Sequence, residues 1–370
     1  MIRICHMTSA HDPEDVRIFH KECVSLARAG YEVYLVERGE SYDKNGVHIV
    51  GVGEIRDERL KRMTDGAKRV YEKALSLDCD IYHFHDPELL PYGLKLKKQG
   101  KIVVFDSHEN TADAIMEKGY IPKPIRGLIC AAYKNYERSV CSRLDAIVPV
   151  TPTMTDNFRK MNPNTVEVRN YPILPESYTN ADHREKTIVF AGGISRQWNH
   201  HIVVQALEKL EGCRYVLCGG RNAYLDSLKE LPGWDHVDYK GKIPHAEVAH
   251  ILAEGLIGVA LLTPGRNTAW KIGTMGNTKI FEEMLAGLPI ICTDFDLWKE
   301  FVERYHCGIC IDPTDPEQFC AAAKQLLDNP AEAVKMGQNG RRAVEEEFNW
   351  AVAEKALLGL YGSLANKIAR

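Results

Sequence analysis

The sequence lacks several features that would assign it to other classes of protein. No apolar run approaches the length of a membrane-spanning helix, and we expect no signal peptide. The net charge is −4, so the basic excess that would favour nucleic acid as a partner is missing. The turn after the first expected strand lacks G-x-G-x-x-G, so a dinucleotide cofactor is not indicated. We expect a cytoplasmic protein with no cofactor.

Cysteine does not point to a disulfide framework or to a metal site. The chain has 11 cysteines, an odd number scattered through expected strands and helices, as in a reduced cytosolic protein. One C-x-x-C pair occurs, Cys307 and Cys310, but it runs into an expected strand and has no second pair. We therefore interpret this pair as part of the core and predict no metal ligands.

The length and the order of segments predict two α/β domains. A chain of 370 residues exceeds one typical domain. Apolar runs of strand length alternate with helix-like segments, which is typical of doubly wound parallel sheets. Prolines and a polar run after residue 172 indicate a linker. We expect an N-terminal Rossmann-like domain at 1–172, a C-terminal one at 173–351, and a last helix at 352–370.

The expected strands follow one another in the order of two βαβ series. Those of the first domain are 2–6, 31–36, 101–105, 146–150 and a short strand at 166–168; those of the second are 187–191, 214–218, 238–242, 255–264, 290–293 and 308–311.

Polar residues follow the strands of the first domain. His11, His85 and His108 each come just after an expected strand. Ligands bind beyond the carboxyl ends of parallel strands, so these histidines should line one rim together with Asp15 and Asp86. A single histidine is usually structural, but three at matching strand ends indicate a cleft. We predict that this cleft binds a ligand; the family resemblance given below implies that the ligand is the acceptor substrate.

Residues 55–77 are helix-compatible and rich in lysine and arginine. A solvated helix face is the favoured interpretation; a surface that touches anionic lipid is the alternative.

The second domain contains a pattern typical of an anion site. The apolar run 255–264 leads into a glycine loop, and Asn277 is suited to cap a helix that extends to about residue 286. Free backbone N–H groups and the positive end of the helix dipole face whatever lies above the sheet. Lys279 adds a cation in the first turn, and Glu282 lies about one turn further along.

Several motifs resemble the family 4 (group 1) glycosyltransferases, which have the GT-B fold of two Rossmann-like domains facing across a cleft. Residues 279–291 look like the donor-binding helix of that family. Motifs similar to one bacterial, polysaccharide-synthesis branch occur in the same order along the chain, at 8–18, 83–87, 106–109, 170–172, 307–310 and 348–350.

The resemblance implies retaining, metal-independent sugar transfer from a nucleotide-diphosphate donor. Glu282 matches the second glutamate of the E-x7-E motif, which binds the ribose, and His108 matches the histidine at the sugar. The last helix is expected to pack back on the first domain. The remaining donor residues implied by the family are the glycine turn Gly192 and Gly193, the nucleobase segment Lys242 and Ile243, and the diphosphate segment Gly276, Asn277, Thr278 and Lys279.

The sequence departs from the family pattern at two points. Thr274 stands where the first E-x7-E glutamate belongs, and the cations expected after Gly192 do not align. Arg196 or Lys271 is the candidate that neutralises the leaving diphosphate. Of two Asp-x-Asp strings, only Asp294–Asp296 follows a strand, and we expect it to hold no metal.

Three functions remain in view. The favoured one is transfer from a UDP- or GDP-linked sugar to a saccharide or lipid-linked acceptor in cell-surface polysaccharide synthesis, in the cytoplasm or peripherally at the inner membrane face. The alternatives are a sugar-nucleotide epimerase and a non-catalytic binder of nucleotide-sugars. The sequence does not indicate the sugar, the base, the acceptor or the oligomeric state.

Overall fold

A computed structural model describes residues 1–55, 58, 61–108, 110–117, 121–178 and 185–368. The chain forms two compact units: unit 1 comprises Met1–Asn170 and Trp350–Arg370, and unit 2 comprises Tyr171–Asn349. The boundaries expected from sequence, after residues 172 and 351, differ from these by two residues. The linker expected at 176–186 lies partly outside the described residues.

Unit 1 is built on a parallel sheet with the strand order β3-β4-β2-β1-β5-β6-β7. Only β3, at one edge, pairs antiparallel with its neighbour among the described strands. The strands are β1 (Arg3–Met7), β2 (Glu32–Glu37), β3 (Tyr42–Lys44), β4 (Val47–Gly51), β5 (Ile81–Phe84), β6 (Ile102–Ser107) and β7 (Ala146–Pro149).

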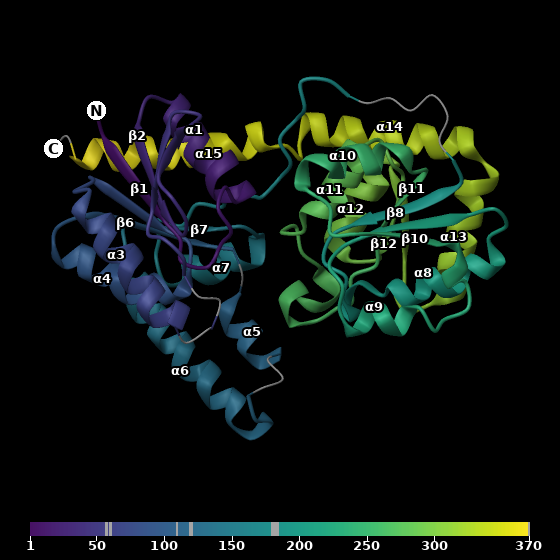
Figure 1. Cartoon of the computed structure of the whole chain (residues 1–370), viewed down its shortest axis with the longest axis horizontal. Helices are drawn as coiled ribbons and strands as arrows, with labels where there is room; N and C mark the ends of the chain where they lie inside the picture. Colours follow the sequence, from purple (N-terminus) through teal and green to yellow (C-terminus); the bar gives the residue numbers. More distant parts are fainter. Residues whose placement is uncertain (56–57, 59–60, 109, 118–120, 179–184, 369–370) are drawn as a thin grey trace. The chain divides into compact units, whose positions relative to one another are not determined.

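Helices cover both faces of this sheet (Figure 1). One face packs against η1 (Val16–Cys23), α1 (Val24–Arg28) and α15 (Trp350–Ile368). The other packs mainly against α3 (Ala67–Ser76), α4 (Leu90–Lys98), α6 (Lys123–Cys141) and α7 (Pro152–Arg159). The shorter segments are η2 (Arg62–Gly66), η3 (Pro87–Leu89) and α5 (Thr111–Glu117).

The C-terminal helix α15 belongs to unit 1, as the family resemblance implied. Leu357, Leu360 and Leu364 recur at helical spacing and are buried against the sheet. The Trp350 indole N–H donates to the Ser25 hydroxyl at 2.9 Å, which ties the start of α15 to α1. The last helix therefore completes the core of the unit that the first residues begin.

Unit 2 has a parallel sheet with the order β10-β9-β8-β11-β12-β13. Its strands are β8 (Thr187–Ala191), β9 (Arg214–Cys218), β10 (Val237–Gly241), β11 (Ile257–Ala260), β12 (Ile290–Thr293) and β13 (Gly308–Ile311). Its helices are α8 (His200–Ala206), α9 (Ala223–Leu228), α10 (His245–Glu254), α11 (Thr278–Leu285), α12 (Asp296–Tyr305), α13 (Pro316–Asp328) and α14 (Pro330–Glu346). Short helical segments are η4 (Arg196–Trp198), η5 (Leu207–Lys209), η6 (Trp234–His236), η7 (Arg266–Thr268) and η8 (Trp270–Ile272).

Two expectations about strands are corrected by the structure. No strand forms at 166–168: Thr165 makes an isolated bridge to Ile147, and Val166 N donates to the Ile147 carbonyl at 3.0 Å. The apolar run 255–264 is a strand only at Ile257–Ala260, because the residues that follow leave the sheet in a buried loop. Both segments contain buried residues, as strands do, but burial alone does not create the backbone hydrogen bonds of a sheet.

Of the basic segment expected at 55–77, the structure describes residues 55, 58 and 61–77, and the last of these ranges contains η2 and α3. Its cations face nearby acids: Arg62 pairs with Glu88 at 3.1 Å, and Lys68 with Glu72 at 3.6 Å. These ion pairs are consistent with the favoured interpretation, in which the basic residues lie on a solvated helix face. None of the helices that the structure describes is both long and apolar enough to cross a membrane.

Candidate active site

A cavity of about 590 Å³ in unit 1 lies at the carboxyl ends of β1, β5 and β6. His11, His85, Asp86 and His108 line it, so four of the residues predicted from strand ends meet there. The His108 ring centroid lies 5.0 Å from that of His11 and 5.2 Å from that of His85. The cavity also receives aromatic rings from α6, those of Tyr133 and Tyr136.

Asp86 organises one wall of this cavity. Its buried Oδ2 accepts hydrogen bonds from the Thr8 hydroxyl (2.9 Å) and the Ser9 backbone N–H (2.6 Å), which fixes the loop after β1. Its Oδ1 lies 3.1 Å from His11 Nδ1. Burial acts to raise the pKa of Asp86, but the bond and charge of His11, together with the hydrogen bonds from Ser9 and Thr8, outweigh it and the pKa is lowered. Burial acts to lower the pKa of His11, but the bond and charge of Asp86, together with the charges of Asp15 and Asp106, outweigh it and the pKa is raised, which favours an imidazolium–carboxylate pair.

Asp15, also predicted for this cleft, has a structural task. Its Oδ1 accepts from the backbone N–H groups of Arg17 (2.8 Å) and Ile18 (3.0 Å), so it caps the N-terminus of η1.

His108 is mostly buried, with 16% of its side chain exposed. Burial lowers its pKa to about 4, and the neighbouring carboxylate of Asp106 only partly offsets this. The imidazole is therefore neutral near pH 7. A neutral ring carries one N–H and one lone pair, and because Nε2 lies 3.2 Å from His85 Nδ1, Nδ1 is the nitrogen left for a substrate hydroxyl.

A buried carboxylate pair lies beneath the histidines. Asp106 Oδ2 receives the Arg17 guanidinium at 2.8 Å, while Glu22 Oε1 lies 3.1 Å from Arg17 Nε. All three side chains are almost completely buried. Burial raises the pKa of Glu22 well above its usual value, and the neighbouring Asp106 raises it further. Burial also acts to raise the pKa of Asp106, but Arg17 together with His108, Glu22 and His83 outweighs it, so Asp106 is ionised and Glu22 protonated.

Two groups of side chains in unit 1 have spacings that would accommodate a metal ion. One is His6, Glu22, His83 and His85; the other is His85, Asp106 and His108; within each, the ligand atoms lie within 4.8 Å of one another. Most of the imidazole nitrogens concerned already face hydrogen-bonding partners, as described below. The one Asp-x-Asp string that follows a strand is also engaged, since Asp294 pairs with Lys271.

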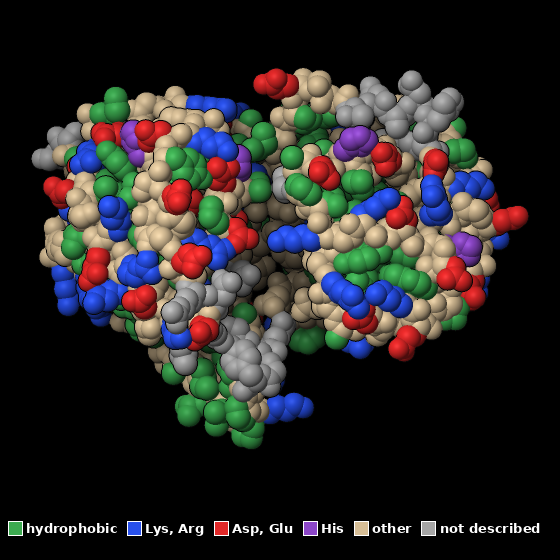
Figure 2. Space-filling view, viewed as in Figure 1, with side chains coloured by type: hydrophobic (Ala, Val, Ile, Leu, Met, Phe, Trp, Pro, Cys, Tyr) green, Lys and Arg blue, Asp and Glu red, His purple; other side chains and the backbone are tan. Residues whose placement is uncertain are grey.

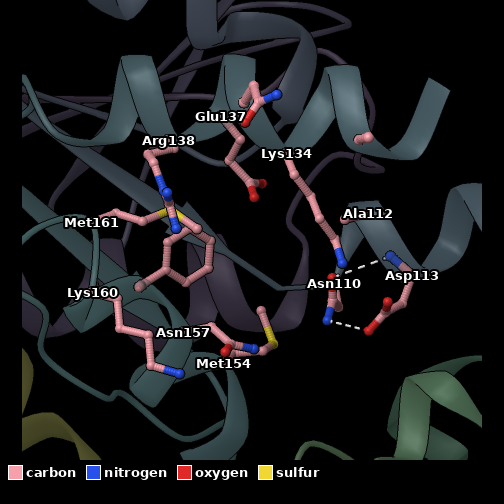
Figure 3. Close-up of a pocket in the computed structure, with 13 residues that line it drawn as sticks. Asn110, Ala112, Asp113, Lys134, Glu137, Arg138, Met154, Asn157, Lys160 and Met161 are labelled. Atoms are coloured by element: carbon pink, nitrogen blue, oxygen red, sulfur yellow. Dashed lines mark hydrogen bonds between the residues drawn. The ribbon is translucent and has the colours of Figure 1, made fainter. Parts of the chain in front are cut away.

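A second cavity in unit 1, of about 480 Å³, lies between α6 and α7 (Figure 3). Three cations line it, Lys134, Arg138 and Lys160, with the amides of Asn110, Asn135 and Asn157. Glu137 lies buried at its wall, and burial raises its pKa to about 7. Cations and amides together suit an anionic, hydroxyl-rich ligand.

In unit 2 the N-terminus of α11 lies beside the glycine turn after β8. The Asn277 side chain caps α11 by accepting from Lys279 N at 3.3 Å. The Lys279 side chain passes directly over Gly192: a Cβ at Gly192 would come within 1.9 Å of Lys279 Cε. Its ammonium lies 5.4 Å from the Trp198 ring centroid. Two elements that are 87 positions apart thus form one cationic corner at the ends of β8 and α11.

The other predicted donor residues follow strands of unit 2 or lie on α11. Arg196 is held over the Tyr224 ring at 5.2 Å, and Gly193 has open space where a side chain would project. Lys242 and Ile243 follow β10. Glu282 is half-buried on α11, next to Glu283, which faces the sheet at Gly258.

Thr274 and Lys271 have partners within unit 2. The Thr274 hydroxyl accepts from Gly276 N at 3.1 Å, and its carbonyl accepts from the Trp298 indole at 2.7 Å. Lys271 pairs with Asp294. Of the two candidate cations for the diphosphate, Arg196 is therefore the one without a carboxylate within ion-pair distance among the described residues.

Sequence reasoning missed the buried residues behind the histidines. His6 and His83 are register partners in β1 and β5, and Tyr361 reaches them from α15. The alternation His83-x-His85 and the histidine near the end of the first strand were visible signals. No signal in the sequence indicated Tyr361, which is more than 270 positions away along the chain.

Comparisons with known proteins identify both halves of the chain. The family model for "Glycosyltransferase Family 4" matches residues 17–170, and that for "Glycosyl transferases group 1" matches residues 177–343. A GDP-mannose-dependent alpha-(1-6)-phosphatidylinositol monomannoside mannosyltransferase of Mycobacterium tuberculosis is 26% identical over 207 residues, 53% of this chain and 50% of the relative. The chain thus spans about half the length of this curated relative.

Two solved structures share the fold. Sucrose-phosphate synthase of Thermosynechococcus elongatus superposes with a TM-score of 0.79 at 17% identity, covering 99% of this chain and 100% of the other. Anabaena HepE, solved in complex with UDP and glucose, superposes with a TM-score of 0.73 at 12% identity, covering 98% and 100%. The resemblance seen in the sequence is confirmed: the chain belongs to the group 1 glycosyltransferases, and its two parallel-sheet units have the GT-B fold.

Proposed function

We propose that the protein is a retaining, metal-independent glycosyltransferase that moves a sugar from a UDP- or GDP-linked donor to a saccharide or lipid-linked acceptor in cell-surface polysaccharide synthesis. The observation that carries the proposal is the Lys279 ammonium, placed by Gly192 at the N-terminus of α11. A cation and free backbone N–H groups at one helix end form a site for a diphosphate.

The donor site is in unit 2 and the acceptor cavity is in unit 1. Glu282 accepts hydrogen bonds from the ribose, Asn277–Lys279 hold the diphosphate, and His108 contacts the sugar. A GDP-mannose-dependent relative and a UDP-bound structural neighbour both support a nucleoside-diphosphate donor. We leave the base open between uracil and guanine.

Charge stabilisation supplies the catalysis. As the bond between the anomeric carbon and the donor phosphate breaks, negative charge grows on the diphosphate, where Lys279 and the α11 N-terminus stabilise it. The acceptor oxygen forms the new bond on the same face of the sugar. Its proton passes to a phosphate oxygen of the leaving diphosphate, so no carboxylate nucleophile is needed.

A transfer assay distinguishes this function from its alternatives. The protein is incubated with UDP-glucose or GDP-mannose, with and without a crude lipid-linked oligosaccharide fraction. Nucleotide release that requires the acceptor supports transfer. Conversion of the donor without acceptor would identify an epimerase, and binding without turnover a non-catalytic protein.

His108 tests the placement of the sugar. His108→Ala should lower turnover and leave the affinity for free UDP or GDP unchanged, because the nucleotide binds in unit 2. A loss of both turnover and nucleotide affinity, together with a lower melting temperature, would show that His108 is structural.

Metal independence follows from the same charges. Lys279 and the helix end already supply the positive charge that a divalent ion would bring to the diphosphate. We expect full transfer activity after dialysis against EDTA. Strict dependence on added Mg²⁺ or Mn²⁺ would contradict this part of the proposal.

Helix α6 supports a lipid-linked acceptor and peripheral membrane contact. Its first half exposes Ile125 (45%), Leu128 (73%) and Ile129 (38%) at helical spacing. Figure 2 shows hydrophobic side chains gathered at the lower end of unit 1, where α6 begins in Figure 1. Lys134 and Arg138 on the same helix line the cationic cavity, which suits a phosphate group beside a hydrocarbon chain.

Vesicle flotation tests the membrane contact. The protein should float with vesicles containing phosphatidylglycerol, and a Leu128→Ser, Ile129→Ser double variant should not. Val334→Ser, on α14 of unit 2, replaces a side chain of comparable exposure (40%) and serves as the control. Equal flotation of all three proteins would exclude α6 as the contact.

A further inference from the structure

A chain of hydrogen-bonded side chains leads from His108 into the core of unit 1. His108 Nε2 lies 3.2 Å from His85 Nδ1, and His85 Nε2 lies 2.9 Å from His6 Nδ1. His6 Nε2 lies 3.3 Å from the Tyr361 hydroxyl, which lies 2.7 Å from His83 Nδ1. Apart from His108 at its outer end, every member is buried, with at most 2% exposure.

The number of protons restricts this chain to two arrangements. Burial lowers the pKa of each imidazole, so each ring is neutral and carries one N–H. Four links then need four donors that all point the same way. Either every proton points inward from His108 towards His83, or every proton points outward. No ring can change its tautomer without breaking a link.

The Asp106 carboxylate favours the inward arrangement. Its oxygens lie 3.8 Å from His83 Nε2 and 3.7 Å from His108 Nε2, and both nitrogens carry protons when the chain points inward. The outward arrangement puts a proton near Asp106 only on His85 Nδ1, at 3.9 Å. Its other protonated nitrogens, His6 Nδ1 and His83 Nδ1, lie 4.0 and 3.9 Å from Glu22, which is protonated and carries no charge. Two N–H groups near the Asp106 anion are therefore more favourable than one.

We infer that His85, His6, Tyr361 and His83 are positioning residues that hold His108 as the Nε2–H tautomer and leave its Nδ1 as an acceptor for a sugar hydroxyl. Tyr361 is the decisive link, because its hydroxyl accepts from His6 and donates to His83. The inference about the sugar rests on the proposed transfer function; the tautomer itself does not.

The distances favour hydrogen bonds over a metal among these residues. His6 Nδ1 and His85 Nε2 face each other at 2.9 Å, as donor and acceptor do, and His83 Nδ1 faces a hydroxyl. A bound metal would take the lone pairs that the chain uses. Arg17, which lies 3.1 Å from Glu22, adds a positive charge where the metal's carboxylate ligand would be.

The tautomer can be measured directly. Long-range ¹H–¹⁵N spectra of protein labelled at histidine distinguish Nε2–H from Nδ1–H imidazole, and His108→Gln assigns the signal. We expect a single Nε2–H form of His108 near pH 7. Tyr361→Phe leaves the His6 N–H without an acceptor, so His6, His85 and His108 should shift towards the opposite tautomers.

Tyr215→Phe is the matched control. Tyr215 is also fully buried, and its hydroxyl lies 2.8 Å from Nδ1 of a buried histidine, His200, but in unit 2. Both variants lose one tyrosine–histidine bond, yet only Tyr361→Phe should change the His108 signal. The kcat of Tyr361→Phe should fall roughly tenfold, the effect of one lost hydrogen bond, with little change in KM.

The outcomes separate the inference from the proposed function. An Nδ1–H His108 in the unaltered protein, no tautomer change in Tyr361→Phe, or stoichiometric metal in the purified protein by elemental analysis would each overturn the inference. Absence of any transfer activity, with the tautomer as expected, would instead overturn only the proposed reaction.

Discussion

At the scale of single residues, the donor site depends on how closely one side chain can approach a backbone. Lys279 occupies the space where Gly192 has no Cβ, whereas the neighbouring Gly193 faces open space. The two glycines look equivalent in the sequence but differ in what a methyl group would meet.

This difference gives a paired test. Gly192→Ala should displace Lys279 and lower the affinity for UDP or GDP about tenfold, the loss of one charge-assisted contact. Gly193→Ala should leave the affinity unchanged. Titration calorimetry with the diphosphates and the corresponding monophosphates measures both. Equal losses in the two variants, or equal affinity of the unaltered protein for di- and monophosphates, would contradict the placement of the diphosphate.

Glu282 gives a second prediction at this scale. Charge-assisted hydrogen bonds from two ribose hydroxyls are worth roughly 1.5–3 kcal/mol, so Glu282→Gln should weaken nucleotide binding about tenfold or more. Thr274→Ala should have a smaller effect on transfer, because the Thr274 hydroxyl already accepts from Gly276 N. Glu300→Gln, at an exposed position on α12, is the control. Unchanged affinity in Glu282→Gln would remove its role as ribose ligand.

At the scale of elements, α15 links the end of the chain to the beginning. It buries a row of apolar side chains against η1, α1 and the sheet, and it carries Tyr361 to the histidines of β1 and β5. The helix is therefore both part of the core of unit 1 and a support for its cavity.

Shortening a side chain in α15 should consequently destabilise unit 1. Leu357 is fully buried, and Leu357→Ala should lower the free energy of unfolding by about 2–5 kcal/mol. The adjacent Leu358 is only partly buried, and Leu358→Ala should cost less. Urea unfolding followed by circular dichroism measures both. A similar decrease in the free energy of unfolding for both variants would mean that α15 does not bury the face that carries Leu357.

At the scale of the whole molecule, the buried histidines should make the free energy of unfolding depend on pH below about pH 6.5. Burial lowers the pKa of His83 to about 3, and those of His6 and His85 well below 6.5. The unfolded chain binds these protons near pH 6.5 and the folded chain does not, so acid favours unfolding. Only His11, whose pKa is raised, acts in the opposite direction among these cavity histidines.

Each buried histidine should therefore lower the free energy of unfolding below about pH 6.5, by up to about 1.4 kcal/mol per pH unit. Buried acids such as Glu22 and Glu137, whose pKa values burial raises, act in the opposite direction over the same range, so the histidine contribution is measured as a difference between variants. Urea titrations at pH 7.5 and 5.5 measure the slope. His83→Gln should remove one such contribution from the slope, and His48→Gln, at an exposed position, should not. The same slope in His83→Gln and in the unaltered protein would show that this ring is protonated in the folded state.

Much of the architecture was predictable because local patterns agree with the fold. Asn277 does cap the helix that it was expected to cap, and Gly287 ends it with a φ of +72°. Nine of the expected strand segments fall within one or two residues of β1, β2, β6, β7, β8, β9, β10, β12 and β13. By contrast, the hairpin of β3 and β4 and the helix α12 were not identified, since short or mixed segments carry weak periodicity.

The sequence by itself determined the family, the two α/β units and the strand ends at which His11, His85, Asp86 and His108 meet. These properties depend on short-range periodicity, capping and motif order, which the chain carries locally. Only the tertiary structure decided that Asp15 caps a helix, that Lys279 passes over Gly192, and that Tyr361 completes a chain of buried imidazoles. Each depends on strand order and on packing between residues far apart in the chain, where a displacement of one ångström decides whether a contact exists.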